Sequence, residues 1–267
     1  MRRVLLLGLV AAGLLAIGFI SMSNIGIVNV SATQWTGLNY PMGVAIGDYD
    51  NDGLNDIAIV EYYAGRVTVY RSDGTTVIKQ WTGLSYPSGV AIGDYNNDGL
   101  NDLAFTESNK VTVYKSDGTT VVKQWTGLPG MVYFVAIGDY DNDGLNDLAF
   151  EDYGDGGRVL VYRIDGTTII KQWTGLGNVR GVAIGDYDND GFNEIAFASI
   201  SGAQGNVTIY KSDGTTIVKQ WTGVNWASGV AIGDYDNDGS NDLAFAETNR
   251  GRVLVYKSEG PIVIKQW

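Results

Sequence analysis

Short hydrophobic runs alternate with turns rich in Gly, Asp and Asn along most of the chain. The run Arg66–Tyr70 alternates Val with Thr and Tyr, which is the two-residue period of a half-buried β-strand. The run Asp56–Val60 is continuously apolar after its first residue, as in a strand covered on both faces. An Asp73-Gly74 pair between two such runs predicts a tight hairpin turn. The first unit is therefore predicted to contain four strands, at Val44–Gly47, Asp56–Val60, Arg66–Tyr70 and Thr76–Trp81.

This unit occurs five times. The tripeptide Gly-Asp-Tyr returns at steps of 46, 45, 47 and 48 residues, starting at Gly47, Gly93, Gly138, Gly185 and Gly233. Four antiparallel strands every ~45 residues is the sequence pattern of a β-propeller blade. We therefore predict an all-β fold, a β-propeller of five blades over residues 36–267. Residues 24–35 end like a further fourth strand, and are predicted to form a lead-in strand that lies either beside the last blade or against a neighbouring molecule.

A tryptophan closes each repeat. The pair Gln-Trp recurs with the same period as the strands, and we expect each indole to pack between neighbouring blades. The tryptophans are Trp35, Trp81, Trp125, Trp173, Trp221 and Trp267.

The N-terminus has the features of an export signal. Arg2 and Arg3 precede an apolar run from Val4 to Ile20, followed by small residues that suit a signal peptidase. Residues 1–23 are therefore predicted to be either a cleaved signal peptide or a retained hydrophobic membrane anchor. Both alternatives place the rest of the chain outside the cytoplasm, as a secreted or cell-surface protein.

Composition removes several classes of function. The 267 residues include no Cys and no His, which excludes disulfides, thiolate metal sites and the usual general base of hydrolases. The formal net charge of −12 argues against binding to nucleic acid. We therefore expect a protein that is not an enzyme.

The acidic residues are concentrated in one loop of each repeat. The loops share the pattern D-x-D-x-D-G-x-x-D, and alternate carboxylates with a turning glycine can converge on one cation. An oxygen-only ligand set suits Ca²⁺, so about five Ca²⁺ ions are expected, one per blade. Asn96 replaces one carboxylate and should make the second site the weakest. The backbone carbonyl of the residue after the glycine is included in the predicted metal ligands, which are Asp48, Asp50, Asp52, Leu54, Asp56; Asp94, Asn96, Asp98, Leu100, Asp102; Asp139, Asp141, Asp143, Leu145, Asp147; Asp186, Asp188, Asp190, Phe192, Glu194; and Asp234, Asp236, Asp238, Ser240, Asp242.

Two other interpretations of these loops fit the sequence less well. An EF-hand shares the start of the pattern but needs Glu at its twelfth position, where the first loop has Ile59 inside a strand. Acidic hairpin turns without metal would leave several carboxylates close together, and their repulsion would force some of them to hold protons.

The stretch Gly-Asp-Tyr-Asp-Asn-Asp-Gly-x-Asn-Asp, followed by Ile or Leu, Ala and an apolar residue, resembles the FG-GAP (VCBS-type) repeats of integrin α-subunit propellers and of microbial surface proteins. The resemblance covers all five units. It implies a propeller with a calcium ion between the first and second strands of each blade. Integrin propellers have seven blades and carry literal Phe-Gly and Gly-Ala-Pro motifs, whereas this chain has five units and lacks those motifs.

The loops on the opposite side of the blades differ from repeat to repeat. Aromatic residues here suit stacking on a sugar or gripping a protein, and the predicted ligand-binding residues are Tyr40, Tyr86, Tyr133 and Trp226. The same residues could instead only cap the blade cores. We therefore expect an extracellular recognition or adhesion module for a protein or glycan. One alternative is a structural subunit of a surface assembly or filament anchored through the N-terminus. The other is a polysaccharide-active enzyme that uses the cluster Glu151, Asp152 and Asp155.

Overall fold

The computed structural model describes residues 34–202, 204–258 and 263–266. They form five antiparallel sheets of four strands each, every sheet following chain order. Blade 1 consists of β1 (Pro41–Gly47), β2 (Asp56–Glu61), β3 (Arg66–Tyr70) and β4 (Val77–Thr82). Blade 2 consists of β5 (Pro87–Gly93), β6 (Asp102–Glu107), β7 (Lys110–Tyr114) and β8 (Val121–Trp125). Blade 3 consists of β9 (Val135–Gly138), β10 (Asp147–Asp152), β11 (Arg158–Tyr162) and β12 (Ile169–Thr174).

Blade 4 consists of β13 (Asn178–Gly185), β14 (Glu194–Ser201), β15 (Gln204–Tyr210) and β16 (Ile217–Val224). Blade 5 consists of β17 (Ala227–Gly233), β18 (Asp242–Glu247), β19 (Arg252–Lys257) and β20 (Val263–Gln266). The helices in the described part of the chain are two short 3₁₀ turns, Gly154–Gly156 and Thr248–Arg250. This is the predicted all-β propeller with five blades.

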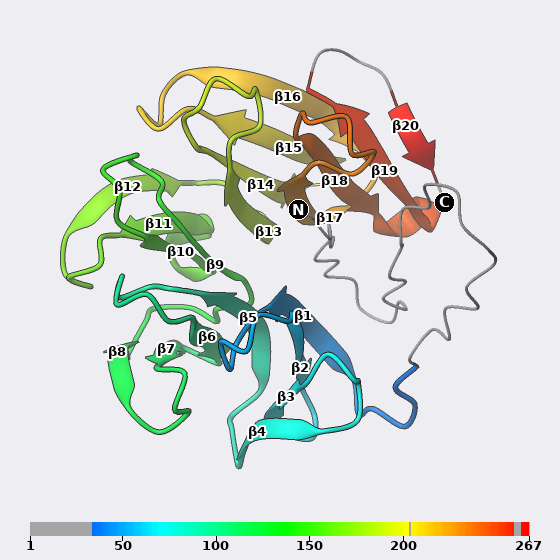
Figure 1. The fold of residues 1–267 in the computed structure, drawn as a ribbon. Helices are drawn as coiled ribbons and strands as arrows, with labels where there is room; N and C mark the ends of the chain where they lie inside the picture. The colour runs from blue at the N-terminus through cyan, green and yellow to red at the C-terminus, as the bar shows by residue number, and fades with distance from the viewer. Residues whose placement is uncertain (1–33, 203, 259–262, 267) are drawn as a thin grey trace.

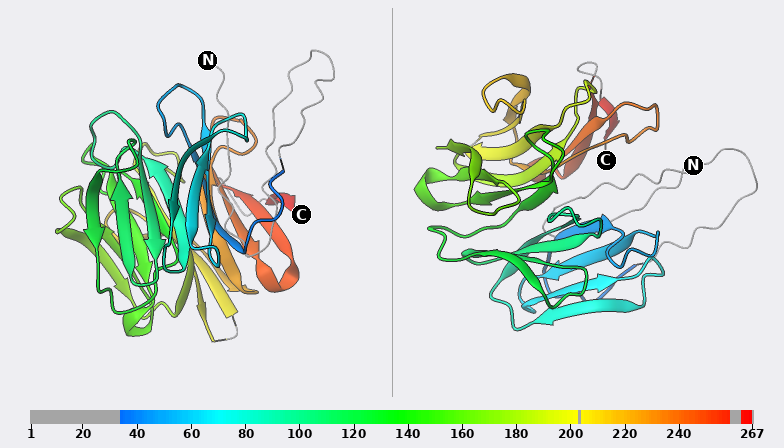
Figure 2. Two further views of the ribbon diagram at one scale, coloured as in Figure 1. Left: turned by 90° about the horizontal axis from the view of Figure 1, so that it is seen from below. Right: turned by 60° about the vertical axis from the view of Figure 1, so that its left-hand side comes forward.

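The first strand of each blade lies toward the centre and the fourth lies at the outside (Figure 1). Consecutive first strands contact one another from β1 through β5, β9 and β13 to β17. Glycines permit this approach: a Cβ added to Gly43 would lie 2.3 Å from the carbonyl oxygen of Ser88 in the next blade. Seen from the side, the strands run between two sets of loops that form the two faces of the propeller (Figure 2).

The strands of blade 1 follow the sequence pattern, but β2 ends at Glu61 rather than Val60, and β4 spans Val77–Thr82 rather than Thr76–Trp81. β3 spans the predicted Arg66–Tyr70, but β1 starts three residues before the predicted Val44. The added residues include Pro41, which occupies the first position of a strand, where its missing N–H is tolerated. The pairing of β1 with β2 shifts between Pro41 and Gly43, so this extension is irregular.

Tryptophans pack between blades, as predicted. The Trp81 ring of β4 lies 5.6 Å from the Phe105 ring and 5.4 Å from the Tyr114 ring, both in blade 2. Trp125, Trp173 and Trp221 make the same contacts with the blade that follows each of them.

The start of the described chain repeats this contact. Trp35 lies 5.8 Å from Tyr70 of β3, which is the position that a tryptophan of a preceding blade would take. Most of the predicted lead-in strand, residues 24–33, lies outside the described residues, as does Trp267.

The predicted signal peptide or anchor, residues 1–23, is also outside the described residues. Within residues 34–202, 204–258 and 263–266, no helix has the length and hydrophobicity needed to span a membrane.

Candidate metal centres and the opposite face

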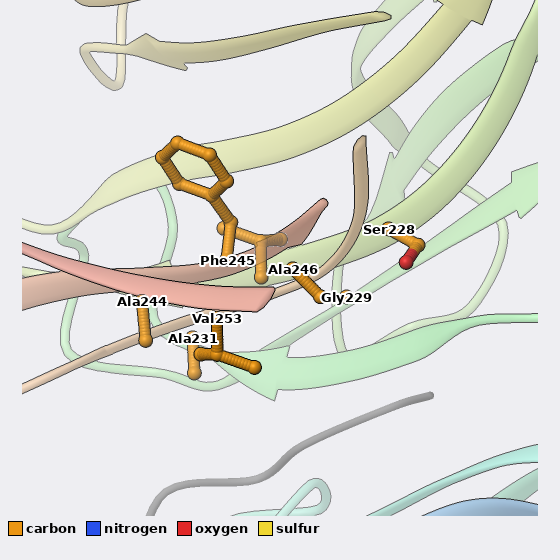
Figure 3. A pocket seen from close by; sticks show the side chains of 8 residues that line it. Ser228, Gly229, Ala231, Ala244, Phe245, Ala246 and Val253 are labelled. Atoms are coloured by element: carbon orange, nitrogen blue, oxygen red, sulfur yellow. The ribbon is translucent and has the colours of Figure 1, made fainter. Parts of the chain in front are cut away.

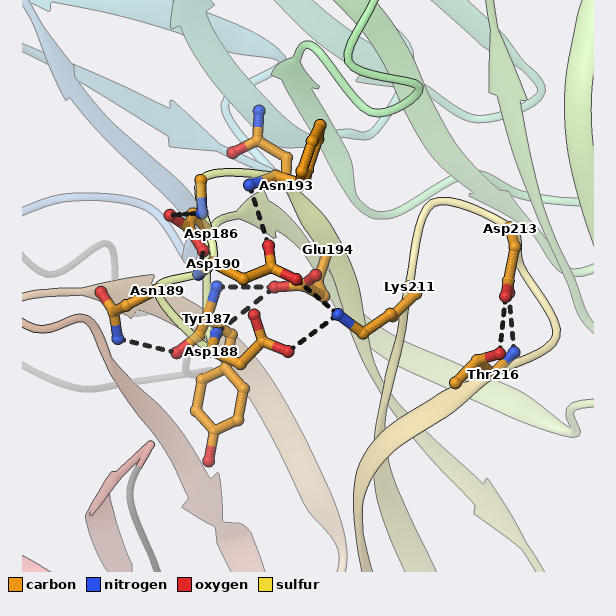
Figure 4. Close-up of polar contacts among 12 residues, drawn as sticks. Asp186, Tyr187, Asp188, Asn189, Asp190, Asn193, Glu194, Lys211, Asp213 and Thr216 are labelled. Carbon is orange, nitrogen blue, oxygen red and sulfur yellow. Dashed lines mark hydrogen bonds and ion pairs between the residues drawn. The ribbon is translucent and has the colours of Figure 1, made fainter.

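The acidic loop between the first and second strands of a blade is folded by its own carboxylates (Figure 4). In blade 4, Asp186 accepts the backbone N–H groups of Asp190 at 3.1 Å and Gly191 at 3.0 Å. Glu194, the first residue of β14, accepts the N–H of Tyr187 at 2.9 Å. These bonds curl the loop back on itself and bring its alternate side chains to one point.

Two backbone positions make the curl possible. Asn189 has a φ of 60° and Gly191 a φ of 90°, and both values are left-handed. Asn tolerates this region better than most residues, and Gly has no Cβ to clash there. Asn51, Asn97, Asn142 and Asn237 repeat the Asn189 conformation, with φ between 55° and 60°.

Four of the five loops gather three carboxylates at one place. One oxygen from each member lies within 4.8 Å of the others, and the residue that begins the second strand is the buried member of each group. The groups are Asp48, Asp50 and Asp56; Asp139, Asp141 and Asp147; Asp186, Asp188 and Glu194; and Asp234, Asp236 and Asp242.

The donor set of these groups fits a hard cation. The Oδ1 atoms of Asp50, Asp56 and Asp188 are buried and accept no hydrogen bond within the described part of the chain. Leaving a buried carboxylate oxygen without a partner is costly, and a bound cation would supply the missing one. Carboxylate oxygens without nitrogen or sulfur are the ligands that Ca²⁺ prefers.

The pKa values of the buried carboxyls also favour a bound cation. Burial, together with the neighbouring carboxylates, raises the pKa of Asp147 to about 7 and that of Glu194 to about 7. The same causes raise the pKa of Asp102 and of Asp242 to about 6. Without a cation Asp147 and Glu194 would therefore be partly protonated at neutral pH, and a cation would have to compete with those protons.

The second loop differs from the other four. Asn96 stands where they have Asp, and its Nδ2 donates to Asp102 at 3.3 Å. The described residues of this loop form no group of three converging carboxylates. This geometry matches the expectation that the second site is the weakest.

The third aspartate of each loop lies outside these groups. Its Oδ1 accepts the N–H of the residue two positions later, as Asp52 does from Leu54 at 2.9 Å. Its other oxygen faces a basic residue in four blades, in the pairs Asp98–Lys115, Asp143–Arg163, Asp190–Lys211 and Asp238–Lys257. The side chains of Leu54, Leu100, Leu145 and Phe192 are exposed at the loop tips, so only their backbone carbonyls could serve a metal.

A basic residue at the end of each third strand partly neutralises the loop of its own blade. Arg71 bonds Asp50 at 2.7 Å, Arg163 bonds Asp141 at 2.5 Å, and Lys211 pairs with Asp188 at 3.0 Å. A cation bound by Asp50 or Asp188 would share the carboxylate with the basic side chain, which contacts Oδ2 and leaves Oδ1 without a partner among the described residues.

Asparagines link the loops of consecutive blades. The Nδ2 of Asn101 donates to the backbone carbonyl of Asp48, the first acid of the preceding loop, at 2.7 Å. Asn146, Asn193 and Asn241 make the same bond to Asp94, Asp139 and Asp186, at 2.6 to 2.8 Å. The equivalent Asn55 of blade 1 is exposed, whereas these four are half-buried. The loops of the five blades thus form one connected arc.

On the opposite face, the equivalent position at or before the start of each first strand carries Tyr40, Tyr86, Met131, Asn178 and Trp226. Tyr40, Tyr86 and Trp226 have left-handed φ values of 57°, 51° and 57°, which are unusual for bulky residues. Tyr40 lies 4.8 Å from Tyr63 between ring centroids, and both are exposed. The predicted Tyr133 lies two residues beyond Met131, to which its hydroxyl donates, and it is only half-exposed.

Buried acids at the end of the second strand hold these loops in place. Glu61 accepts the N–H of Asn39 at 2.8 Å, Glu107 that of Ser85 at 3.1 Å, and Glu247 that of Asn225 at 3.1 Å. Their charge is met by the basic residue that starts the third strand, in the pairs Glu61–Arg66, Glu107–Lys110, Asp152–Arg158 and Glu247–Arg252. These pairs were not predicted from the sequence, although in four blades an acid ends the second strand and a base starts the third.

Comparison with known proteins places this geometry in a family. A model of the FG-GAP-like repeat matches residues 48–105, 94–150 and 186–245. No curated protein sequence matches the chain.

Solved structures share the fold. The crystal structure of BBS1N in complex with ARL6DN is 15% identical, with a TM-score of 0.54 over 86% of this chain and 82% of that chain. The structure of the Dos1 propeller is 9% identical, with a TM-score of 0.57 over 85% of this chain and 58% of that chain, so this chain covers less than two thirds of it. At these identities the likeness shows the fold alone. The matched repeats, which span the acidic loops of all five blades, show that the chain belongs to the family of FG-GAP-like repeat propellers.

Proposed function

We propose that this chain is an exported β-propeller that binds Ca²⁺ in its acidic loops and recognises an extracellular protein or glycan through the opposite face. The observation that carries the calcium proposal is the set of buried carboxylate oxygens that lack a hydrogen-bond donor, in Asp50, Asp56 and Asp188. A cation at each loop would fix the turn between the first and second strands, in a chain that has no disulfides.

The recognition role is supported by the variation of the opposite face. Its loops differ from blade to blade in residues that the blade itself does not require, and exposed aromatics gather there. The export proposal is supported by Arg2, Arg3 and the apolar run that follows them, and by the family of the repeats.

Binding is favoured over catalysis by the state of the acids on this face. Glu151 is buried and accepts the N–H of Tyr133 at 2.6 Å, while Asp152 is buried and bonded to Arg158 at 2.6 Å. Both acids therefore have structural partners, and the chain has no His to act as a base.

Thermal melting with and without chelator tests the calcium proposal. Adding EDTA should lower the melting temperature by about 10 °C or more, because one site held at about 100 times its Kd contributes about 2.7 kcal/mol. Excess Ca²⁺ should restore it, and calorimetric titration should count four stronger sites and one weaker site. A melting temperature that EDTA leaves unmoved would refute the calcium proposal.

Glycan and protein arrays probed with the calcium-loaded chain test recognition. Binding should be reduced when Tyr40, Tyr86 and Trp226 are all changed to Ala, with the calcium stoichiometry unchanged. Binding that survives all three changes would show that the opposite face is not the recognition surface. Mass measurement of the native protein tests export, since signal cleavage would remove about 15–30 residues and a retained anchor would leave the full length.

A further inference from the structure

Two hollows in the described part of the propeller differ greatly in size. The one in blade 5, beside Phe245 and Ala246, has a volume of about 10 Å³ and has room for no more than a single water (Figure 3). The other has a volume of about 440 Å³ and opens on the opposite face between blades 3, 4 and 5. Its lining includes Tyr153, Asn178, Arg180, Ser201 and Trp226. A volume of this order suits a small ligand or one to two sugar rings.

Arg180 is the one strongly charged group in this lining. Its guanidinium carbon lies 5.5 Å from the centroid of the Trp226 ring. It forms no hydrogen bond or ion pair with any residue in 34–202, 204–258 or 263–266, and its Nε is buried without a partner. A half-buried guanidinium with donors to spare is suited to a ligand with paired acceptor oxygens.

Blade 4 lacks the acid–base pair that the other four blades form between the end of the second strand and the start of the third. Ser199 and Asn206 pair across β14 and β15, where the other four blades pair an acid with a base. The blade that carries Arg180 therefore lacks the buried carboxylate that would otherwise stand near it.

The nearest acids of blade 3 do not replace that carboxylate. Asp152 is bonded to Arg158. Burial raises the pKa of Glu151 well above its usual value, while the N–H of Tyr133 and the positive charge of Arg180 act in the opposite direction. The hollow thus presents a guanidinium that forms no ion pair within the described residues, on a molecule whose net charge is −12.

We propose that this hollow binds the carboxylate-bearing ring of an acidic sugar, a uronic acid unit of a glycan, with Arg180 as the carboxylate receptor. A guanidinium matches a carboxylate with two parallel hydrogen bonds. Trp226 and Tyr153, which are 38% and 53% exposed, offer flat faces for the apolar side of a sugar ring. Asn178 and Ser201 offer polar groups for its hydroxyls. The inference rests on the recognition role proposed above and names its ligand class.

Methyl glucuronide and methyl glucoside form a matched pair of probes, because they differ only in the carboxylate. Titrated into the calcium-loaded full chain and followed by NMR, the glucuronide should bind about ten to a hundred times more tightly. Arg180→Gln should remove this preference, Arg180→Lys should keep part of it, and Trp226→Ala should weaken both ligands. Lys219→Gln, which removes a positive charge from the outer strand β16 of the same blade, should change neither affinity.

Several outcomes would overturn the inference. Equal affinity for the two glycosides, or a preference that survives Arg180→Gln in a protein with unchanged melting temperature and calcium stoichiometry, would exclude the carboxylate site. Acetyl-aspartate amide binding as tightly as the glucuronide would show a receptor for acidic peptides instead. A chain that binds neutral glycans or a protein on arrays through the opposite face, but ignores the glucuronide, would refute this site and leave the proposed recognition role intact.

Discussion

The same five blades build both faces of this propeller, yet the two faces differ in how much they repeat. On the loop face, the left-handed Asn recurs in all five blades within a few degrees of φ, and the asparagine link recurs in four. On the opposite face, one equivalent position carries Tyr, Tyr, Met, Asn and Trp. A contact that stabilises every blade has to be present in every blade. A surface that binds a ligand at one place needs residues that differ between blades. The loop face is therefore expected to control stability, and the opposite face to control specificity.

The largest expected effect on stability comes from removing the first acid of one acidic loop. Asp139→Ala removes a member of one carboxylate group and the acceptor for two backbone N–H groups, of Asp143 and Gly144. The free energy of unfolding should fall by about 3 kcal/mol in Ca²⁺, which lowers the melting temperature by about 6–12 °C. Calorimetric titration should count one Ca²⁺ fewer.

A hairpin-turn acid of the same blade provides the control for charge. Asp165→Asn removes an equal charge between β11 and β12, and should leave the number of bound Ca²⁺ unchanged. If both variants lost one Ca²⁺, the loop groups would not be the calcium sites.

Breaking one link between loops should have an intermediate effect. Asn193→Ala removes the bond to the carbonyl of Asp139 and should lower the free energy of unfolding by about 1–2 kcal/mol. Asn55→Ala is the matched control, since Asn55 is the exposed equivalent in blade 1, and its effect should stay within about 0.5 kcal/mol. Equal effects of the two changes in urea denaturation would mean that the links do not stabilise the propeller.

The second loop can be made to resemble the others. Asn96→Asp restores the missing carboxylate and should raise the calcium affinity of the weakest site about tenfold, or about 1.4 kcal/mol. Calorimetric titration should then count five sites of similar strength. A titration curve identical to that of the wild type would mean that loop 2 does not bind Ca²⁺ even with the full set of acids.

The smallest expected effect on stability belongs to the opposite face. Tyr86 is 51% exposed and has a strained left-handed backbone, so Tyr86→Ala should change the free energy of unfolding by about 0.5 kcal/mol or less. A loss above about 2 kcal/mol in the same urea experiment would show that this face is structural, and the contrast between the faces would fail.

Repetition explains how far the sequence alone could predict this molecule. The five copies of the Gly-Asp-Tyr loop identified the strands and the number of blades, because each copy reports the same local geometry. They did not show that the third aspartate of each loop and the acids of the second loop lie outside the converging groups. The opposite face has no such redundancy. Arg180 belongs to one blade only. Its lack of an ion-pair partner within the described residues depends on Ser199 and Asn206, which pair across the sheet where the other blades carry an acid and a base. That relation is set by strand pairing and by packing between blades, which no local sequence pattern contains.

The asparagine links have a consequence for how fast each loop exchanges its ion. Within the described residues, the loops of blades 2, 3 and 4 are tied to a neighbour on both sides, whereas those of blades 1 and 5 are tied on one side only. Release of a cation requires its loop to open, and a loop tied on one side opens at lower cost. In a rapid-mixing experiment with chelator, the ions of blades 1 and 5 should therefore leave before those of blades 3 and 4, even where the equilibrium affinities are equal.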